Sequence, residues 1–554
     1  MLKLPYGISD YEKIINEGYY YIDKTMYLSM LENTASTILY LRPRRFGKSL
    51  FTSMMYYYYD INSKNKFNKL FKNTYIYNNP TKNKNNYYIL RLDFSGISVN
   101  SNDINDMMNN FNLCLYNGIN EFVNHYNLEY EIDKNLNPSG AIKDFFNFYR
   151  DLKLKNKLYI IIDEYDNFTN SILSSSKDMF NKILGNDGFV KAFYASIKSA
   201  TINGLVDRVF ITGVCSISLD AMTSGFNIAT NITNFEFYNA MTALTYDEVK
   251  KIIDSSDIDN IDEAFSILVN NYDGYKFSGE VEEKVFNPTL VIYYLNYYNN
   301  FNKFPVELMD SNIISSYEKI KNIINLNNNY KEILDDIFDN RKVDSELISN
   351  FDSLDNLDKY GVISLLYYFG YLTIESCPLS NIYRFVIPNK VIDNVYNKYY
   401  LSILTEYNLV TNNSSEIDTI LDIKNNGNIE PLCNYVSALL KNADNRLYIN
   451  FKEKDLQLLI YSILTKYDDF NTYIEYPSLD NYIDIMILKN NKSNYNIMIE
   501  LKYIKKKEYS KRVFNNIKKD AIREINKYIE DDRISKYYLK KYIIIFIGSD
   551  YKLF

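Results

Sequence analysis

Short apolar runs separated by polar, helix-compatible stretches dominate the first 240 residues of the chain. Strands that are apolar on both faces are typical of buried parallel sheets, whose crossover connections are helical. The runs at 37–41, 88–93, 158–162 and 208–213 fit this pattern, and helices are expected from Lys48 and around 189–202. The pattern predicts an α/β domain with a parallel sheet over residues 1 to about 240.

Two further segments of this region have distinct patterns. Asp23 is a suitable N-cap for a helix that runs through Glu32, because its carboxylate can accept a bond from a free backbone N–H. Residues 61–86 are rich in Asn and Lys, so a surface excursion is expected there.

From 241 to 410 the pattern is mainly helical and is interrupted by turns at 272–275 and at Asn287-Pro288. A hairpin-like pair, 371–374 with 383–387, indicates a small winged-helix-like element. The polar stretch 411–416 is the best candidate for a linker.

Beyond the linker, the pattern predicts a second α/β arrangement. It consists of helices near 418–441 and 453–466, strands around Asp484 and Glu500, a basic helical stretch to about 530, and a last strand at 542–547. The predicted domains are therefore 1–240, 241–410 and 415–554, with the core of the last at about 447–554.

The length and composition of the chain limit the number of domains and the kinds of metal or catalytic site that it can form. A chain of 554 residues exceeds the size of a single core, so two to four domains of roughly 100–200 residues are expected. The four cysteines are far apart, which argues against zinc sites and disulfides, so any metal should be held by oxygen. The only histidine, His125, lies in a polar stretch and is expected at the surface. The isolation of His125 in that stretch removes Ser-His-Asp, Cys-His and His-metal nuclease chemistries from the candidates.

Charge and hydropathy limit the partners and the location. The net charge of −7 excludes a uniformly basic nucleic-acid coat protein, so any contact with nucleic acid must be local. No run of about 18 apolar residues is present and no signal-like segment opens the chain, so neither a membrane span nor secretion is expected. The expected location is the cytoplasm.

The segment Arg42 to Ser49, RPRRFGKS, lies between a predicted strand and a predicted helix, as a P-loop does. Backbone N–H groups around Gly47 would attract phosphate, Lys48 would reach the β and γ oxygens, and Ser49 would help to hold Mg²⁺. Arg42 stands where the usual pattern has its first glycine. Arg44, Arg45 and Arg208 either neutralise phosphate or form surface ion pairs.

The apolar run 158–162 ends in Asp163-Glu164, which is the layout of a Walker-B segment. Asp163 would be a ligand of Mg²⁺, and Glu164 would orient the water that attacks the γ-phosphate. The alternative is a helix N-cap at the end of a strand, a position that Asp favours. Thr212, at the end of the next strand, is a candidate polar sensor between these acids and the phosphate.

Asp484 lies on one apolar run and Glu500-Leu501-Lys502 follows a second. Alternate residues of a strand share a face, so Glu500 and Lys502 point together, and pairing of the two strands would bring Asp484 beside them. Two carboxylates that hold Mg²⁺ beside an ammonium that steadies water or phosphate form a nuclease centre. The alternative is a pair of edge strands with exposed charges.

A basic run follows directly: Lys505, Lys506, Lys507, Lys511, Arg512, Lys518 and Lys519, with Glu508 as the only acid among them. Such a run is either a solvated helix face or a clamp for the DNA backbone, which would bind without sequence preference and in a salt-sensitive way.

Several motifs occur together in one order and extend the N-terminal signal: Asp23-Lys24-Thr25, Arg42 to Ser49, Arg91 to Ser95, Ile162 to Asp166, Ile211 to Val214, Thr223 to Ile228, Tyr272 to Tyr275, and Asn287-Pro288. In this order the chain resembles the AAA-ATPase-like family that carries a C-terminal PD-(D/E)XK nuclease domain, over most of its length. The arginine at position 42 is normal for that family. The resemblance implies ATP and Mg²⁺ as cofactors, with Mn²⁺ as a substitute, and a homo-oligomer, because related ATPases often borrow an arginine from a neighbour.

The resemblance also implies further residues of a restriction-endonuclease-like fold. Asp484, Glu500 and Lys502 match its strand motif, and Glu453 best matches its helix carboxylate, with Glu475 as a second candidate. Glu524 stands where resembling families often have glutamine, which exchanges a donor for an acceptor.

The leading interpretation is an ATP-binding protein whose ATP module regulates or drives a Mg²⁺-dependent DNA nuclease domain. The alternative is a scaffold or signalling ATPase whose inactive nuclease-like domain only binds nucleic acid. A third interpretation is a relic that lacks both activities.

Overall fold

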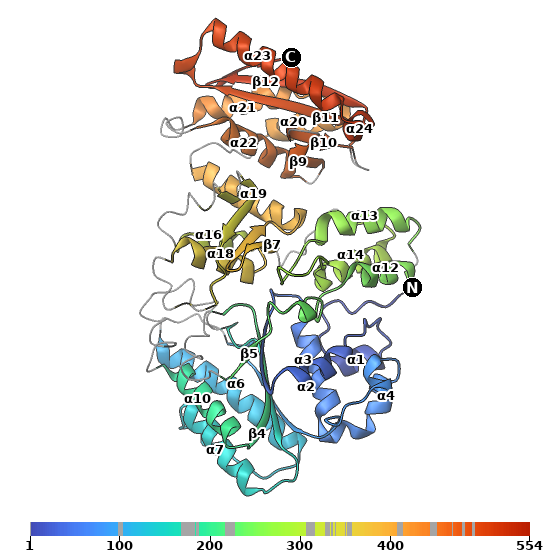
Figure 1. Cartoon of the computed structure of the whole chain (residues 1–554), viewed down its shortest axis with the longest axis vertical. Coiled ribbons are helices and arrows are strands. Elements are labelled where there is room, and N and C mark those ends of the chain that lie inside the picture. The colour runs from blue at the N-terminus through green and yellow to red at the C-terminus, as the bar shows by residue number, and fades with distance from the viewer. Residues whose placement is uncertain are drawn as a thin grey trace. The chain divides into compact units, whose positions relative to one another are not determined.

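The computed structural model of the chain describes most of its residues (Figure 1). The described residues are 2–97, 103–167, 183, 188–216, 228–256, 258–305, 316–326, 333, 336–337, 340–349, 351, 357–406, 414–443, 451–467, 469–478, 482–489 and 493–554. They form two compact units: Met1–Ser315 with Lys319–Ile392, and Ser316–Glu318 with Asp393–Phe554. The first unit combines the predicted region 1–240 with most of 241–410; the three-domain division stays a prediction.

The first unit contains a five-stranded sheet in the order β2-β3-β4-β1-β5, with every neighbouring pair parallel. Its strands are β1 Thr37–Leu41, β2 Tyr88–Asp93, β3 Leu158–Asp163, β4 Val206–Gly213 and β5 Thr230–Asn231. All of β1 and all but the last residue of β3 are buried, as expected of strands with a helical layer on each face. The parallel sheet predicted from the apolar runs is confirmed.

Helices cover both faces of this sheet (Figure 1). One layer contains α1 Tyr11–Asn16, α2 Met26–Thr34, α3 Lys48–Tyr59, α4 Phe67–Phe71 and α5 Tyr75–Asn78, and the other contains α6 Ile104–His125, α7 Pro138–Asp151 and α10 Phe189–Ile202. The helices predicted from Lys48 and around 189–202 are confirmed.

The predicted surface excursion over residues 61–86 is wrong. This segment contains the short helix η1 Ile61–Asn65 as well as α4 and α5. Phe67, Leu70 and Phe71 are buried in the same apolar cluster as the side chains of α3. Their spacing is that of one helix face, and the Asn and Lys residues between them face outward.

Two local predictions about polar residues also need correction. The helix near residue 26 has Thr25, not Asp23, at its N-cap; the carboxylate of Asp23 instead accepts bonds from the backbone N–H groups of Thr25 and Tyr75 at 2.9 and 2.6 Å. His125 is only partly exposed, because its Nε2 lies 3.1 Å from Oδ2 of the fully buried Asp60.

The rest of the first unit is mainly helical, as predicted. Its elements are η2 Glu236–Tyr238, α12 Tyr246–Asp254, α13 Ile261–Tyr272, α14 Pro288–Phe301, α16 Ser316–Ile324, β6 Lys342–Ser345, α18 Lys359–Tyr368, β7 Thr373–Leu379 and β8 Ile382–Val386, with α16 shared between the two units. The predicted hairpin is present as β7 and β8, which pair Ile374 with Phe385, and β6 adds a third antiparallel strand. The winged-helix identity of this element stays a prediction.

The second unit is built on a mixed sheet in the order β13-β12-β11-β10-β9, in which only β11 and β12 are parallel to each other. The strands are β9 Asn471–Pro477, β10 Tyr482–Leu488, β11 Asn496–Ile504, β12 Leu539–Ile547 and β13 Asp550–Leu553. Its helices are α20 Ser414–Asn426, α21 Glu430–Asn442, α22 Glu453–Thr465, η4 Lys506–Glu508, α23 Lys511–Ile529 and α24 Asp532–Ser535, while α19 Lys390–Glu406 spans the boundary between the units.

The predicted linker 411–416 is wrong for its last three residues, which begin α20. Glu416 is 1% exposed and its carboxylate binds Lys466 and the hydroxyl of Tyr435 at 2.8 Å each, so polar sequence here reflects a buried network. Residues 411–413 lie outside the described part. Among the helices that the structure describes, none combines the length and the apolar character needed to cross a membrane.

Candidate functional site

The predicted phosphate loop joins the end of β1 to the start of α3. Gly47 is the N-cap of α3 with φ 76°, and Arg45 has φ 69°. The ammonium of Lys48 is 5% exposed and donates to the carbonyl oxygens of Arg42 and Pro43 at 2.9 and 3.0 Å. Burial lowers the pKa of Lys48, and the acids at the end of β3, Glu164 first, oppose that effect. A cationic group and a helix N-terminus therefore lie together at the carboxyl edge of the sheet, where α/β proteins bind phosphate.

Arg42 has a structural role. Its guanidinium is 1% exposed and donates to the carbonyl oxygens of Leu41, Thr233 and Tyr238, each at 2.8 Å. It also lies 4.0 Å from the ring centre of Phe277. The bonds from both terminal nitrogens offset the cost of burying the guanidinium, while its buried Nε–H has no hydrogen-bond partner. Arg42 therefore fixes the base of the loop and leaves phosphate contact to the later residues.

The predicted Walker-B acids lie at the end of β3, two strands from β1. The hydroxyl of Thr212 on β4 donates to Oδ1 of Asp163, so these two predicted residues are in contact. Glu164 has φ 50°, and burial raises its pKa while the ammonium of Lys48 opposes that effect. The order β3-β4-β1 explains the arrangement, because the three parallel strands end at the same edge of the sheet.

Asp166 supports this edge and was not predicted. It is fully buried, and its carboxylate accepts the backbone N–H groups of Val214 and Cys215, at 2.8 Å for Cys215. It thereby ties the turn after β3 to the end of β4. The signal was present as a third carboxylate in the run Asp163-Glu164-Tyr165-Asp166, but a motif does not show which acid faces inward.

The three candidate arginines lie in different places and have different bonding partners. Arg45 lines the pocket described below, whereas Arg44 is exposed and donates to Oδ1 of Asn167 at 3.0 Å. Arg208 lies near the start of β4, and its guanidinium donates to the carbonyl oxygens of Ala35 and Glu32. That end of the strand is opposite to the phosphate loop, so the predicted phosphate role of Arg208 is wrong.

A pocket of about 430 Å³ opens at the phosphate loop. It brings together five predicted residues, Arg45, Gly47, Lys48, Ser49 and Glu164. Two segments that sequence reasoning missed complete its wall: the N-terminal residues 5–9 and the first turn of α14 with Pro288, Thr289 and Ile292. Asp163, Thr212 and Arg44 are not part of this lining.

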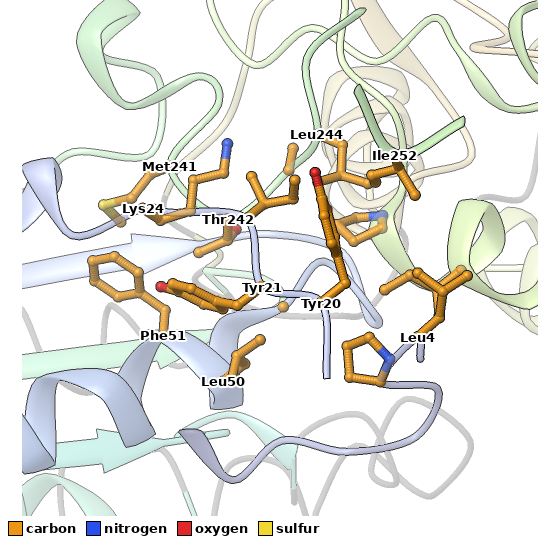
Figure 2. Close-up of a pocket in the computed structure, with 16 residues that line it drawn as sticks. Leu4, Tyr20, Tyr21, Lys24, Leu50, Phe51, Met241, Thr242, Leu244 and Ile252 are labelled. Atoms are coloured by element: carbon orange, nitrogen blue, oxygen red, sulfur yellow. The ribbon is translucent and has the colours of Figure 1, made fainter. Parts of the chain in front are cut away.

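A smaller apolar pocket of about 80 Å³ adjoins it and shares Pro5, Gly47, Leu50, Pro288 and Ile292 with the first. Tyr20, Tyr21, Leu244 and Ile252 are among its other walls (Figure 2). The stem of Lys24 also lines it, and the Lys24 ammonium is paired with Glu248 at 2.7 Å. An apolar cavity therefore adjoins the cavity at the phosphate loop.

In the second unit the three predicted strand residues come together. The ladder between β10 and β11 pairs Ile485 with Ile499, so the next positions, Asp484 and Glu500, face each other across the strands. Oδ2 of Asp484 accepts the backbone N–H of Leu501 at 2.7 Å. Nζ of Lys502 lies 2.5 Å from Oε1 of Glu500.

Acids from two helices complete this cluster. Glu453, the first residue of α22, accepts the backbone N–H of Tyr503 at 3.0 Å and lies 3.8 Å from Nζ of Lys502. Glu524 on α23 lies 3.1 Å from the same nitrogen, so the residue that stands in place of glutamine does reach the centre.

Glu475 is less suited than Glu453 to the role of the helix carboxylate. It lies near the end of β9, and its carboxylate is paired with Lys454 at 2.6 Å. Gln457, which was not predicted, donates to the carbonyl oxygen of Asp484 at 2.6 Å and holds that strand against α22. A lone glutamine among apolar helix residues gave no sequence signal of this contact.

Burial dominates the electrostatics of the cluster. It raises the pKa values of Asp484 and Glu500, and the neighbouring carboxylate of Glu524, to which a protonated Glu500 would donate, raises that of Glu500 further. Burial works against the charge of Lys502, but Asp484 and Glu500 raise its pKa above the ordinary value. Glu500 is 1% exposed, and its Oε2 is buried without a hydrogen-bond partner. A buried carboxylate oxygen without a donor is suited to a cation.

The fit to a metal is that of a two-carboxylate site. Among the described residues, no group of three or more His, Cys, Asp or Glu side chains is arranged to hold an ion. Mg²⁺ commonly takes one or two carboxylates and completes its coordination with water and substrate phosphate oxygens. Asp484 and Glu500 fit this requirement.

The basic run lies mostly on the surface. Lys506 and Lys507 in η4, and Lys511 and Arg512 at the start of α23, are exposed, whereas Lys505 is partly buried. The ammonium of Lys518 lies 3.4 Å from the ring centre of Phe554. The run begins three residues after Lys502, so its charges follow the cluster directly along the chain.

Comparison with known proteins supports the first of the two sites. Residues 5–223 match the model of the AAA-ATPase-like family, which is described as predicted AAA-ATPases. The matched range contains the phosphate loop, Asp163, Glu164 and Thr212 and ends before the second unit begins. No curated protein matches the chain. Among solved structures, a Walker-type ATPase of Pyrococcus abyssi is similar at 11% identity and a TM-score of 0.39, covering 71% of this chain and 98% of its own.

Proposed function

We propose that the first unit binds and hydrolyses ATP. The observation that carries this proposal is the pocket of about 430 Å³ in which Gly47, Lys48, Ser49 and Glu164 share one lining. The match of residues 5–223 to a family of predicted AAA-ATPases supports it.

Each residue has a distinct part in this proposal. The ammonium of Lys48 exchanges its bonds to the loop carbonyls for bonds to the β and γ oxygens of the triphosphate. The hydroxyl of Ser49 and the carboxylate of Asp163 are the oxygen ligands that Mg²⁺ prefers, and the bound ion would neutralise phosphate charge. Thr212 holds Asp163 in position, and Glu164 orients the attacking water.

The apolar pocket beside Gly47 supports a nucleotide rather than a free polyphosphate. A nucleobase needs apolar and aromatic contact, which Tyr20, Tyr21 and Ile252 supply, and the two pockets share a wall. The binding site therefore extends from the phosphate loop across α14.

The test measures ATP binding with Mg²⁺, and the release of phosphate, for the wild type and for Lys48→Ala. Loss of one buried cation from a triphosphate should weaken ATP binding at least tenfold. Lys69→Ala, on the exposed face of α4, is the matched control. Equal binding by the wild type and Lys48→Ala would overturn the proposal.

A second function is favoured by the unbonded Oε2 of Glu500 beside Asp484. We propose that the second unit is a Mg²⁺-dependent DNA nuclease that ATP regulates or drives. Asp484 and Glu500 hold the metal, which would supply a nucleophilic water and charge neutralisation when bound. Lys502 steadies the water or the phosphate, Glu453 positions Lys502, and the basic run contacts the DNA backbone.

Cleavage of plasmid and linear DNA with Mg²⁺ or Mn²⁺, with and without ATP, tests this second function. Cleavage that is lost in Glu500→Gln and Lys502→Ala supports a nuclease. Retained DNA binding without cleavage in the wild type favours the alternative, a scaffold or signalling ATPase with an inactive nuclease-like domain. Failure of both DNA binding and ATP binding leaves only the relic interpretation. A homo-oligomer stays a prediction.

A further inference from the structure

The first turn of α14 is bonded to the phosphate loop. The hydroxyl of Thr289 donates to the carbonyl oxygen of Arg45 at 2.8 Å, across 244 positions of sequence. Both residues line the pocket that also contains Lys48 and Ser49. A helix from the region after the sheet therefore has a direct bond to the segment proposed to hold phosphate.

The accepting residue has an unfavourable backbone conformation. Arg45 has φ 69°, in the left-handed region where residues other than glycine are disfavoured. Gly47, two residues later, has φ 76° without that cost. Such a conformation persists when the surrounding structure stabilises it, and the hydrogen bond from Thr289 is one such stabilising contact.

The donating residue is itself rigidly placed. Asn287 caps α14, and its side-chain oxygen accepts the backbone N–H of Thr289 at 3.0 Å. Pro288 fixes the first helical position, and Leu290 and Val291 anchor the turn in the core. Since both the N–H and the hydroxyl hydrogen of Thr289 are engaged within the protein, Thr289 acts on a ligand through Arg45.

We propose that Thr289 is a positioning residue that holds the phosphate loop in its binding shape by fixing the backbone of Arg45. This inference rests on the proposed ATP site and deepens it. It makes α14 part of the nucleotide site, although α14 lies outside the residues matched by the family model.

The test compares Thr289→Val with Thr289→Ser, since valine keeps the shape of threonine and serine keeps its hydroxyl. The dissociation constant for ATP with Mg²⁺ should rise about tenfold in the valine variant, as expected for one lost hydrogen bond, and stay within about twofold in the serine variant. KM should rise by a similar factor while kcat at saturating ATP changes little. Thr201→Val is the matched control, because its hydroxyl also donates to a backbone carbonyl, that of Ile197, and lines neither pocket.

A second background tests the route through Arg45. Glycine adopts positive φ without strain, so in Arg45→Gly the further change Thr289→Val should cost about threefold or less. If Thr289→Val weakens ATP binding as much in Arg45→Gly as it does in the wild type, the proposal is overturned. A valine variant that binds ATP as the wild type does also overturns it. Should the valine variant fail to fold by circular dichroism, Thr289→Ala takes its place with the same expected loss.

The two proposals fail in distinguishable ways. When Lys48→Ala loses ATP binding and Thr289→Val does not, only the role of Thr289 is wrong. When the wild type and Lys48→Ala bind ATP equally weakly, the ATP site itself is wrong and the role of Thr289 falls with it.

Discussion

The hydroxyl of Thr212 donates a hydrogen bond to Oδ1 of Asp163, at the edge where β3 and β4 both end. Thr212 is 1% exposed and does not line the pocket at the phosphate loop. In the proposed ATP hydrolysis, Thr212 would therefore act through the orientation of Asp163.

Thr212→Val should lower kcat for ATP hydrolysis about tenfold, because a hydrogen bond to a charged group contributes about 1.5–3 kcal/mol. The KM for ATP should change less than about twofold, since the residue makes no contact with the pocket. Steady-state kinetics give both numbers. A rise in KM with unchanged kcat would show that Thr212 serves binding instead.

Glu164→Gln should abolish most ATP hydrolysis and keep ATP binding. The amide cannot accept a proton from water, and loss of a general base costs about 100-fold or more. The side chain stays the same size, and removal of a negative charge near the triphosphate cannot weaken its binding. Phosphate release and nucleotide binding by calorimetry check the two halves separately. Weakened ATP binding would contradict the assigned role.

The affinity of the second unit for Mg²⁺ should rise with pH. Burial raises the pKa values of Asp484 and Glu500, so the folded state binds protons at pH values where the unfolded carboxyls, with pKa about 4, are already ionised. Without metal, this contribution to stability is greatest at low pH and falls as pH rises through the raised values. Mg²⁺ must displace those protons. Titration calorimetry at about pH 6 and about pH 8, in buffers of different ionisation enthalpy, measures the affinity and the protons released. A pH-independent affinity would contradict this prediction.

Glu500→Gln should stabilise the second unit when no divalent cation is present. One ammonium, that of Lys502, faces the four carboxylates of Glu453, Asp484, Glu500 and Glu524. Above the raised pKa of Glu500 its carboxyl is ionised beside Asp484 and Glu524, so neutralising it there should raise the free energy of unfolding by about 1 kcal/mol. At lower pH the carboxyl already holds a proton, so the change should be small. Thermal unfolding in chelator measures it, with Glu508→Gln on the surface as control. With Mg²⁺ added, the wild type should become the more stable protein.

Replacing exposed cations of the basic run should weaken DNA binding in a salt-dependent way. The substitutions are Lys506→Gln, Lys507→Gln, Lys511→Gln and Arg512→Gln, and each phosphate contact that is lost should reduce the slope of log K against log salt by about 0.9. The effect should be the same for unrelated DNA sequences. Binding isotherms over a salt series provide the slope. Lys250→Gln with Lys251→Gln, on the exposed face of α12, is the control. An unchanged slope would identify the run as a solvated helix face.

The strands were predictable because parallel strands that are buried on both faces leave unbroken apolar runs, as in β1 and β3. The sequence also showed which residues end those strands, and hence Asp163 and Thr212, and it placed Lys48 at the start of the helix after β1. It did not show the strand order β3-β4-β1, which depends on contacts between distant segments. The phosphate role of Arg208 failed because Arg208 opens the run 208–213, and the carboxyl ends of the parallel strands, where the phosphate loop lies, are at the other edge of the sheet.

The walls of the pocket at the phosphate loop could not be predicted from local patterns. Residues 5–9 and the first turn of α14 meet at the phosphate loop although more than half of the chain separates them. The core residues Phe67 and Phe71 were hidden among Asn and Lys, which masked a helical period in a segment that reads as a loop. The cluster of the second unit was easier to predict from the sequence, because bringing Asp484, Glu500 and Lys502 together requires only the pairing of two neighbouring strands.

Arg42 changes how this kind of loop is to be recognised. A glycine at the first position keeps a loop tight by having no side chain, whereas here a cation bonded to three carbonyl oxygens and stacked on Phe277 provides the rigidity. A search pattern that demands glycine at that position would discard this chain. The shape of the loop can then be preserved by buried contacts that a one-letter signature does not record.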